Sequence, residues 1–342
     1  MNKNKIKPKI ETDPKNRTPL ETVIPLNTPF VIVIEPSDKC NFKCNFCPTG
    51  DVELMKNTRG RHYGNMNFEL FKKIVDDISG FKNDIKALRL YEHGEPLLNP
   101  ELPNMIKYAK DSKKFNHIEF TTNAFLLKNE LSLKIINSGL DQICISIEGI
   151  NEQQYKEISN VSVDFNKLVN DITFFYKNRK QCKVYIKIFG DNLTENEKEI
   201  FYNTFYDISD QIFIESFGNI WPDFEFKSIE ANKNRGLFNQ ELVDKNICPF
   251  IFYNIVIHSS GEISPCCADW KREIIIGNAN TDNIVDVWNG DNLYSLQKEF
   301  LENGRTNVNN EVCKNCELVK YEAIYNIDKY RKELLKKYIK QG

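Results

Sequence analysis

The sequence lacks a long hydrophobic run, because no apolar stretch approaches the roughly 18 residues that a membrane-spanning helix needs. Its first residues, MNKNKIKPKIETDPKNRTP, are polar and interrupted by proline, and they lack the apolar segment of a signal peptide. Neither charge is in excess: the net charge is -2, so no global basic field favours nucleic acid. We therefore expect a cytoplasmic protein with neither a membrane nor a nucleic acid as partner.

Cysteine, by contrast, is abundant, with ten copies. Structural disulfides are uncommon in a reducing cytosol. The cysteines are also unevenly placed: three fall within residues 40–47, five follow Val243, and only Cys144 and Cys182 stand alone. Clustering of this kind indicates metal sites.

Strand-like and helix-like segments alternate about six times between residues 30 and 217. The expected strands are 30–35, 87–91, 117–123, 142–149, 183–190 and 211–217. The expected helices are 68–78, 100–110, 129–139, 164–178 and 195–209. The alternation predicts an α/β fold with a parallel sheet, best fitted by a partial (β/α)6 TIM-like barrel, and a doubly wound open sheet is the alternative. In a barrel, the chemistry lies at the carboxyl ends of the strands.

The rest of the chain suggests a division into five parts. Residues 1–29 form an N-terminal arm, disordered or lying along the surface, and 30–218 form the core. Residues 219–247 are a polar, irregular linker, and 248–320 are a small cysteine-rich domain of short strands and turns. Residues 321–342 form a basic C-terminal helix, which we expect to be solvated.

The first cysteine cluster is Cys40, Cys44 and Cys47, directly after the first expected strand. Three thiolates on one short loop can ligate three irons of a [4Fe–4S] cluster and leave the fourth iron open. The alternative is zinc, but zinc sites normally use paired C-x2-C spacings and four ligands. The C-x3-C-x2-C spacing therefore favours the iron–sulfur cluster.

The segment CNFKCNFCP after VIVIE resembles the signature of the radical SAM superfamily, and the resemblance extends over about residues 30–217. It implies that S-adenosylmethionine (SAM) chelates the open iron. A reductase such as flavodoxin or ferredoxin would supply an electron, and cleavage would yield a 5′-deoxyadenosyl radical that abstracts hydrogen from the substrate.

The resemblance also implies SAM-binding residues. Phe46 would pack beside the adenine, and Gly94 with Glu95 would contact the SAM amino group, although His93 stands where that family usually has a first glycine. Asn123, at the end of the third strand, is a similar candidate.

Two further expected strands carry polar side chains. Ser146 and Glu148 share one face with Cys144, because side chains alternate along a strand, and the resemblance places Ser146 near SAM. Lys187 interrupts an apolar strand and needs an anionic partner, either the SAM carboxylate or Glu148. Glu148 is also the candidate catalytic base.

The second cysteine cluster resembles the SPASM domain in its shortened form, called Twitch. It implies that Cys248, Cys266, Cys313 and Cys316 ligate an auxiliary [4Fe–4S] cluster, with structural zinc as the alternative. The spacing is most similar to that of the radical SAM dehydrogenase acting on 2-deoxy-scyllo-inosamine. Cys267 is then extra: a substitute ligand, a hydrogen donor or a buried thiol.

Two clusters favour a two-electron oxidation of a small, sugar- or cyclitol-like substrate, in which the auxiliary cluster accepts an electron. The alternatives are a peptide-modifying maturase, a radical epimerase or dehydratase of a sugar-like substrate, and a non-catalytic cluster protein.

Overall fold

The computed structural model describes residues 3–226, 230–322 and 325–339. Residues 1–2 of the expected arm, 227–229 of the expected linker, and 323–324 and 340–342 of the expected C-terminal helix lie outside the described residues. Within the described ranges, none of the helices has the length and apolar character needed to cross a bilayer.

Nine strands form one sheet in the order β6-β5-β4-β3-β2-β1-β7-β8-β9. The strands are β1 (Val31–Ile34), β2 (Ala87–Arg89), β3 (Ile118–Thr122), β4 (Gln142–Ile147), β5 (Lys183–Phe189), β6 (Gln211–Glu215), β7 (Asn254–Ile257), β8 (Glu262–Ser264) and β9 (Gly277–Asn278). Strands β1 to β6 pair in parallel with their sequence neighbours. The six strands expected from the sequence are therefore all present.

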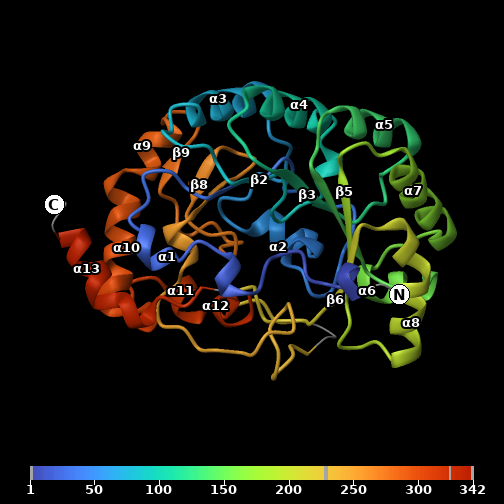
Figure 1. Ribbon diagram of the computed structural model, residues 1–342. Helices are drawn as coiled ribbons and strands as arrows, with labels where there is room; N and C mark the ends of the chain where they lie inside the picture. The colour runs from blue at the N-terminus through green and yellow to red at the C-terminus, as the bar shows by residue number, and fades with distance from the viewer. Residues whose placement is uncertain (1–2, 227–229, 323–324, 340–342) are drawn as a thin grey trace.

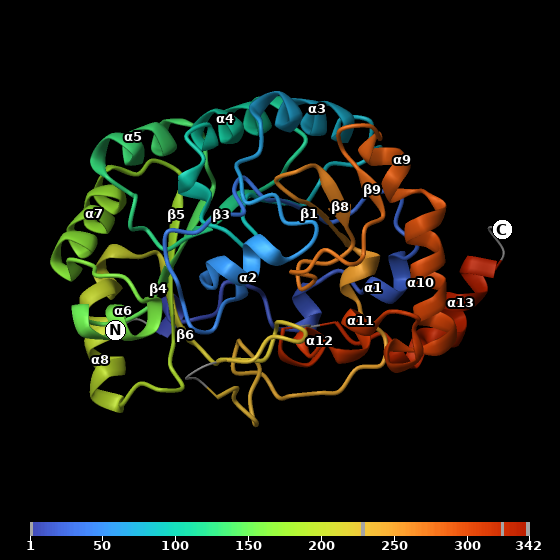
Figure 2. The same ribbon diagram turned by 180° about the vertical axis from the view of Figure 1, so that it is seen from behind.

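The α-helices are α1 (Leu20–Val23), α2 (Val52–Asn57), α3 (Phe68–Ile78), α4 (Leu102–Ser112), α5 (Asn129–Asn137), α6 (Glu152–Ser159), α7 (Phe165–Asn178), α8 (Glu195–Phe205), α9 (Ile284–Trp288), α10 (Asp291–Asn303), α11 (Glu311–Asn315), α12 (Leu318–Tyr321) and α13 (Arg331–Ile339). Figures 1 and 2 show α3, α4, α5, α7 and α8 as an outer arc around the strands, continued by α9, α10 and α13.

The strand order decides between the two expected architectures. A doubly wound sheet reverses its strand order at a switch point, whereas β1 to β6 follow one another without reversal. The crossover helices lie on the outer side of the curved sheet (Figure 1). The fold is thus a partial barrel, and its core lies between the strands and this helical layer, where Ile32, Phe120 and Ile145 are fully buried.

The cysteine-rich region continues the same sheet. Strand β7 pairs in parallel with β1 over four residues, and β8 and β9 extend the edge in antiparallel fashion. The sequence analysis expected short strands here but not their pairing with the barrel. The pairing places the carboxyl ends of β2, β1 and β7 side by side.

Both ends of the described chain pack against the body of the protein. In the arm, Ile6 forms a parallel bridge with Ile212 of β6, and Leu20 of α1 is fully buried. At the other end, α13 begins only at Arg331 and buries Leu334 and Tyr338 against a second core. The expectation of a solvated C-terminal helix is therefore wrong, because one face of α13 is apolar.

Candidate active site

The first cysteine loop is fixed by backbone hydrogen bonds to the end of α6. The amides of Lys43 and Asn45 donate to the carbonyls of Ser159 and Ile158, at 2.9 and 3.1 Å. Within the loop, the Cys47 amide donates to the Cys44 carbonyl at 3.2 Å. These contacts hold the loop over the carboxyl ends of the strands without using the thiols.

The three thiols face a cavity of about 320 Å³ inside the barrel. The cavity is lined by Cys40, Cys44 and Cys47 and by every other residue that the sequence analysis assigned to SAM or catalysis, namely Phe46, Gly94, Glu95, Asn123, Ser146, Glu148 and Lys187. Residues from five strands or strand ends thus converge on one space.

The Gly94–Glu95 segment packs directly on the cysteine loop. The Glu95 amide donates to the Lys39 carbonyl at 2.8 Å, and a Cβ on Gly94 would lie 2.1 Å from the Ser37 carbonyl oxygen. Only glycine permits this approach. The Glu95 carboxylate accepts hydrogen bonds from Leu97 N, Thr122 Oγ1 and Asn123 N at 2.7–3.0 Å. Burial raises the pKa of Glu95 to about 7.

Asn123 connects β3 to the cysteine loop. Its Nδ2 donates to Asn41 Oδ1 at 2.9 Å, and its Oδ1 accepts from the Phe125 amide at 3.0 Å. The side chain therefore positions the loop as well as lining the cavity.

Lys187 has a partner that the sequence analysis did not name. Its Nζ donates to Glu215 Oε2 at 2.6 Å, and Tyr185 Oη donates to the other oxygen of Glu215 at 3.2 Å. Glu215 ends β6, and its register opposite Phe189 of β5 brings it beside Lys187. The pKa of Glu148 is raised to about 7, because the effect of burial exceeds the opposing effect of the Lys187 ammonium.

Phe46 lies in an aromatic corner of the cavity, edge-on to Phe189 at 5.5 Å and to Phe217 at 5.6 Å between ring centroids. These rings line one end of the cavity with an apolar aromatic wall, against which a purine ring can pack.

The other end of the cavity is polar and receives the N-terminal arm. Lys9 Nζ lies 3.0 Å from both Tyr91 Oη and Glu119 Oε1. Arg89 Nε lies 3.1 Å from the same Glu119 oxygen. Glu322, after α12, also lines this end. The sequence analysis missed these residues because Lys9 and Glu322 lie far from any motif.

The second cysteine cluster forms a separate, small cavity of about 20 Å³. It is lined by Cys248, Cys266, Cys313 and Cys316, among apolar side chains. Burial raises the pKa of Cys248 to about 12 and that of Cys316 to about 11. Cys267 instead lines the large cavity.

Comparison with known families identifies this arrangement. The family described as "Radical SAM superfamily" matches residues 34–200, and the family described as "Iron-sulfur cluster-binding domain" (SPASM) matches residues 248–317. This chain is a radical SAM protein with a C-terminal SPASM domain. The first match contains the loop of Cys40, Cys44 and Cys47, and the second contains the four cysteines of the small cavity.

Curated relatives of this radical SAM protein resemble only part of it. A probable GTP 3′,8-cyclase of Methanococcus maripaludis is 33% identical over 122 residues, 35% of this chain and 37% of the relative. An uncharacterized protein of Methanocaldococcus jannaschii is 30% identical over 164 residues, 46% of this chain and 37% of the relative. The matched regions are thus little more than a third of these relatives' length.

Solved structures resemble the chain over most of its length. SuiB of Streptococcus suis bound to S-adenosylmethionine has a TM-score of 0.63 at 18% identity, covering 88% of this chain and 74% of SuiB. BtrN in complex with AdoMet and 2-DOIA has a TM-score of 0.56 at 17% identity, covering 87% and 97%. The anSMEcpe enzyme with bound AdoMet and a peptide has a TM-score of 0.55 at 13% identity, covering 92% and 97%. At these identities the likeness concerns the fold.

The residues present fit the cofactors of this superfamily. All ten cysteines are free thiols, and seven of them occur in two groups, of three and of four. Burial raises the pKa of six of these thiols, and the hydrogen bond with Cys267 together with burial raises that of Cys266, so a bound cation would favour the thiolate forms. The group of three faces a cavity that admits a further ligand, whereas the group of four surrounds a space of only about 20 Å³.

Proposed function

We propose that this radical SAM enzyme oxidises a small polar substrate by two electrons. Cys40, Cys44 and Cys47 would hold the SAM-binding [4Fe–4S] cluster, and Cys248, Cys266, Cys313 and Cys316 an auxiliary one. When bound, the reduced cluster and SAM supply a 5′-deoxyadenosyl radical that removes a hydrogen atom from the substrate. The observation that carries the proposal is the single cavity shared by the three-cysteine loop, the SAM candidates and a polar opposite end.

The aromatic and polar ends of the cavity would orient the two ligands. Phe46, Phe189 and Phe217 form the wall suited to adenine, and Glu95 with Asn123 lies beside the cysteine loop, where the SAM amino group would bind. The substrate would then occupy the end near Lys9 and Glu322.

The polar end favours a substrate rich in hydroxyl or amino groups. Lys9, Arg89, Glu215 and Glu322 present charges of both signs around one small space. A sugar- or cyclitol-like molecule can add hydrogen bonds to such groups, whereas an apolar molecule would displace water from them and add none. BtrN, whose structure holds 2-DOIA, has the same fold.

Glu148 is the proposed proton acceptor. It lines the cavity next to the cysteine loop and within the field of Lys187. A carboxylate there would take the proton from the substrate heteroatom as the carbon is oxidised. The electron released would leave through the auxiliary cluster, and Cys267, which lines the cavity beside Cys266, marks the wall nearest to that cluster.

The test is an anaerobic incubation of the reduced protein with SAM and with candidate cyclitols, aminosugars and peptides. The expected result is 5′-deoxyadenosine in equal amount to a product lighter by two hydrogens. A product that has the mass of the substrate in H2O, and gains one deuterium when the reaction is run in D2O, would indicate epimerisation instead of oxidation. Turnover of a peptide but of no cyclitol or aminosugar would support a maturase instead.

A further inference from the structure

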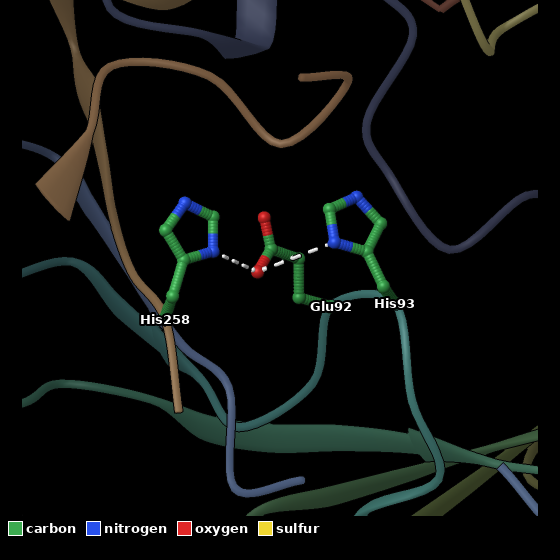
Figure 3. A group of neighbouring side chains, drawn as sticks. All are labelled: Glu92, His93 and His258. Atoms are coloured by element: carbon green, nitrogen blue, oxygen red, sulfur yellow. Dashed lines mark hydrogen bonds and ion pairs between the residues drawn. The ribbon is translucent and has the colours of Figure 1, made fainter. Parts of the chain in front are cut away.

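A second group of chemically distinctive side chains lies at the edge of the large cavity, whose lining includes Glu92. Glu92 and His93 follow β2, and His258 follows β7, on the two strands that flank β1. Figure 3 shows the Glu92 carboxylate between the two imidazole rings. The exposed fractions of the three side chains are 1%, 0% and 0%.

The donor atoms have separations close to those of a metal site. Glu92 Oε2 lies 2.8 Å from His258 Nδ1 and 3.6 Å from His93 Nδ1, and one donor atom from each residue falls within 4.8 Å of the others. Metal–ligand bonds of about 2.0–2.2 Å in a tetrahedral site place neighbouring donors about 3.4 Å apart. The observed separations bracket that value.

The far nitrogen of each ring is anchored, as in known metal-binding histidines. His93 Nε2 lies 2.9 Å from the Cys267 carbonyl oxygen, which can only accept, so the ring proton is on Nε2 and the lone pair on Nδ1. His258 Nε2 lies 2.7 Å from Ser264 Oγ. Burial lowers the pKa of His93 to about 4 and that of His258 to about 3, so both rings are neutral at pH 7.

Buried carboxyl groups outnumber guanidinium groups around the three side chains. Three buried carboxylates, Glu35, Asp38 and Glu92, lie near two guanidinium groups, those of Arg61 and Arg272. Two carboxylate oxygens, Glu35 Oε1 and Glu92 Oε1, are buried and have no hydrogen-bond partner among the described residues. Burial raises the pKa of Glu92 to about 8, so without a metal ion this carboxyl holds a proton at pH 7, and a bound cation would displace that proton.

We propose that Glu92, His93 and His258 bind a divalent transition-metal ion, with zinc as the best match to two imidazoles and one carboxylate. Glu35 Oε1, 3.8 Å from His93 Nδ1, is placed to complete the site. Arg61 Nη1 lies 3.0 Å from His93 Nδ1 and has to move aside. The Arg61 guanidinium also donates to two backbone carbonyls, from Nη1 to Trp270 at 3.3 Å and from Nη2 to Asp38 at 3.4 Å.

The burial of all three side chains indicates a structural ion rather than a catalytic one. It would join the end of β2 to the end of β7 and, through the His93–Cys267 hydrogen bond, hold the loop that carries Cys266. The SAM core and the SPASM domain would thus be linked at a point between the two cysteine sites.

The test is metal analysis of the wild-type protein with both iron–sulfur clusters intact, after addition of zinc alone and removal of loosely bound ions. The expected result is about one zinc per chain whose X-ray absorption shows nitrogen and oxygen neighbours and no sulfur. Sulfur-only neighbours would place the zinc in a cysteine site and overturn the proposal.

Matched variants locate the site. Glu92→Gln and His258→Gln are each expected to abolish zinc retention, while His117→Gln, on a 36% exposed side chain outside the group, retains it. The proposal is overturned if the wild-type protein binds no zinc and shows the infrared band of a protonated carboxyl group, which Glu92→Gln removes. Glu92 would then hold a proton in place of a metal ion. Because metal content is measured without SAM or substrate, the outcome is independent of the proposed oxidation.

Discussion

Replacing Lys9 by methionine tests whether the N-terminal arm is part of the barrel interior. The Lys9 ammonium pairs with Glu119 at 3.0 Å, and the exposed fractions of the two side chains are 15% and 5%. Methionine keeps the length and the apolar stem but removes the charge. Glu119 then retains Arg89 Nε at 3.1 Å as its remaining close cation.

The expected loss is about 1–3 kcal/mol of unfolding free energy. Removing one partner of a buried pair costs about 3–5 kcal/mol when the other charge is left uncompensated, and Arg89 compensates part of it. The matched control is Lys107→Met, whose partner Asp111 and own side chain are 64% and 65% exposed. That pair should contribute no more than about 1 kcal/mol.

The loss should also depend on pH. Burial alone would raise the pKa of Glu119, but Lys9, His117 and Arg89 hold it well below its usual range. A depressed carboxyl pKa stabilises the fold above the unfolded-state pKa of about 4.3. The difference between wild type and Lys9→Met should therefore be full above about pH 5 and shrink as the pH falls through the folded-state value.

Urea unfolding of anaerobically prepared protein, followed at pH 7 and in steps to as far below pH 4 as the protein stays folded, measures both effects. An equal loss in Lys9→Met and Lys107→Met would refute the buried position of Lys9. A loss that grows on acidification would refute the assignment of Glu119 as its ionised partner.

Five further substitutions test the sites. Iron and sulfide analysis of Cys313→Ala should show the loss of up to about four irons per chain. Cys267→Ala should keep the full iron content, because Cys267 lines the large cavity. Equal losses of iron in the two variants would contradict the assignment of Cys313 as a ligand. Glu95→Gln should weaken SAM binding about 10–100-fold in equilibrium dialysis, and unchanged binding would exclude the contact. Lys187→Met should cost about 3 kcal/mol in urea unfolding, because buried Glu215 would keep its hydrogen bond from Tyr185 but lose its cation, and Lys187→Arg should restore most of this loss.

Local patterns predicted most of the barrel. The helix expected at 68–78 is α3 with the same bounds, and the strand expected at 142–149 is β4 at Gln142–Ile147. The helix expected from Pro100 begins only at Leu102, with Glu101 as its N-cap. Helix α6 (Glu152–Ser159) was not expected, because its eight residues carry few apolar side chains.

The local sequence pattern could not predict which strands pair when they lie far apart in the chain. Nothing in NIVI, the sequence of β7, indicates that it pairs with β1 rather than forming a separate small domain. The site shows the same limit. The alternation of β4 correctly places Ser146 and Cys144 in the cavity, but the partner of Lys187 is Glu215, which depends on the register between β5 and β6.

The most direct test of the account is reductive SAM cleavage by the reduced protein, measured as 5′-deoxyadenosine, with the Cys40→Ala, Cys44→Ala and Cys47→Ala triple variant as control. The wild type should form 5′-deoxyadenosine, and the triple variant should form none while keeping the iron that we assign to Cys248, Cys266, Cys313 and Cys316. Formation of 5′-deoxyadenosine by the triple variant, or none by the fully loaded wild type, would contradict the assignment of the three-cysteine loop as the SAM-cleaving site.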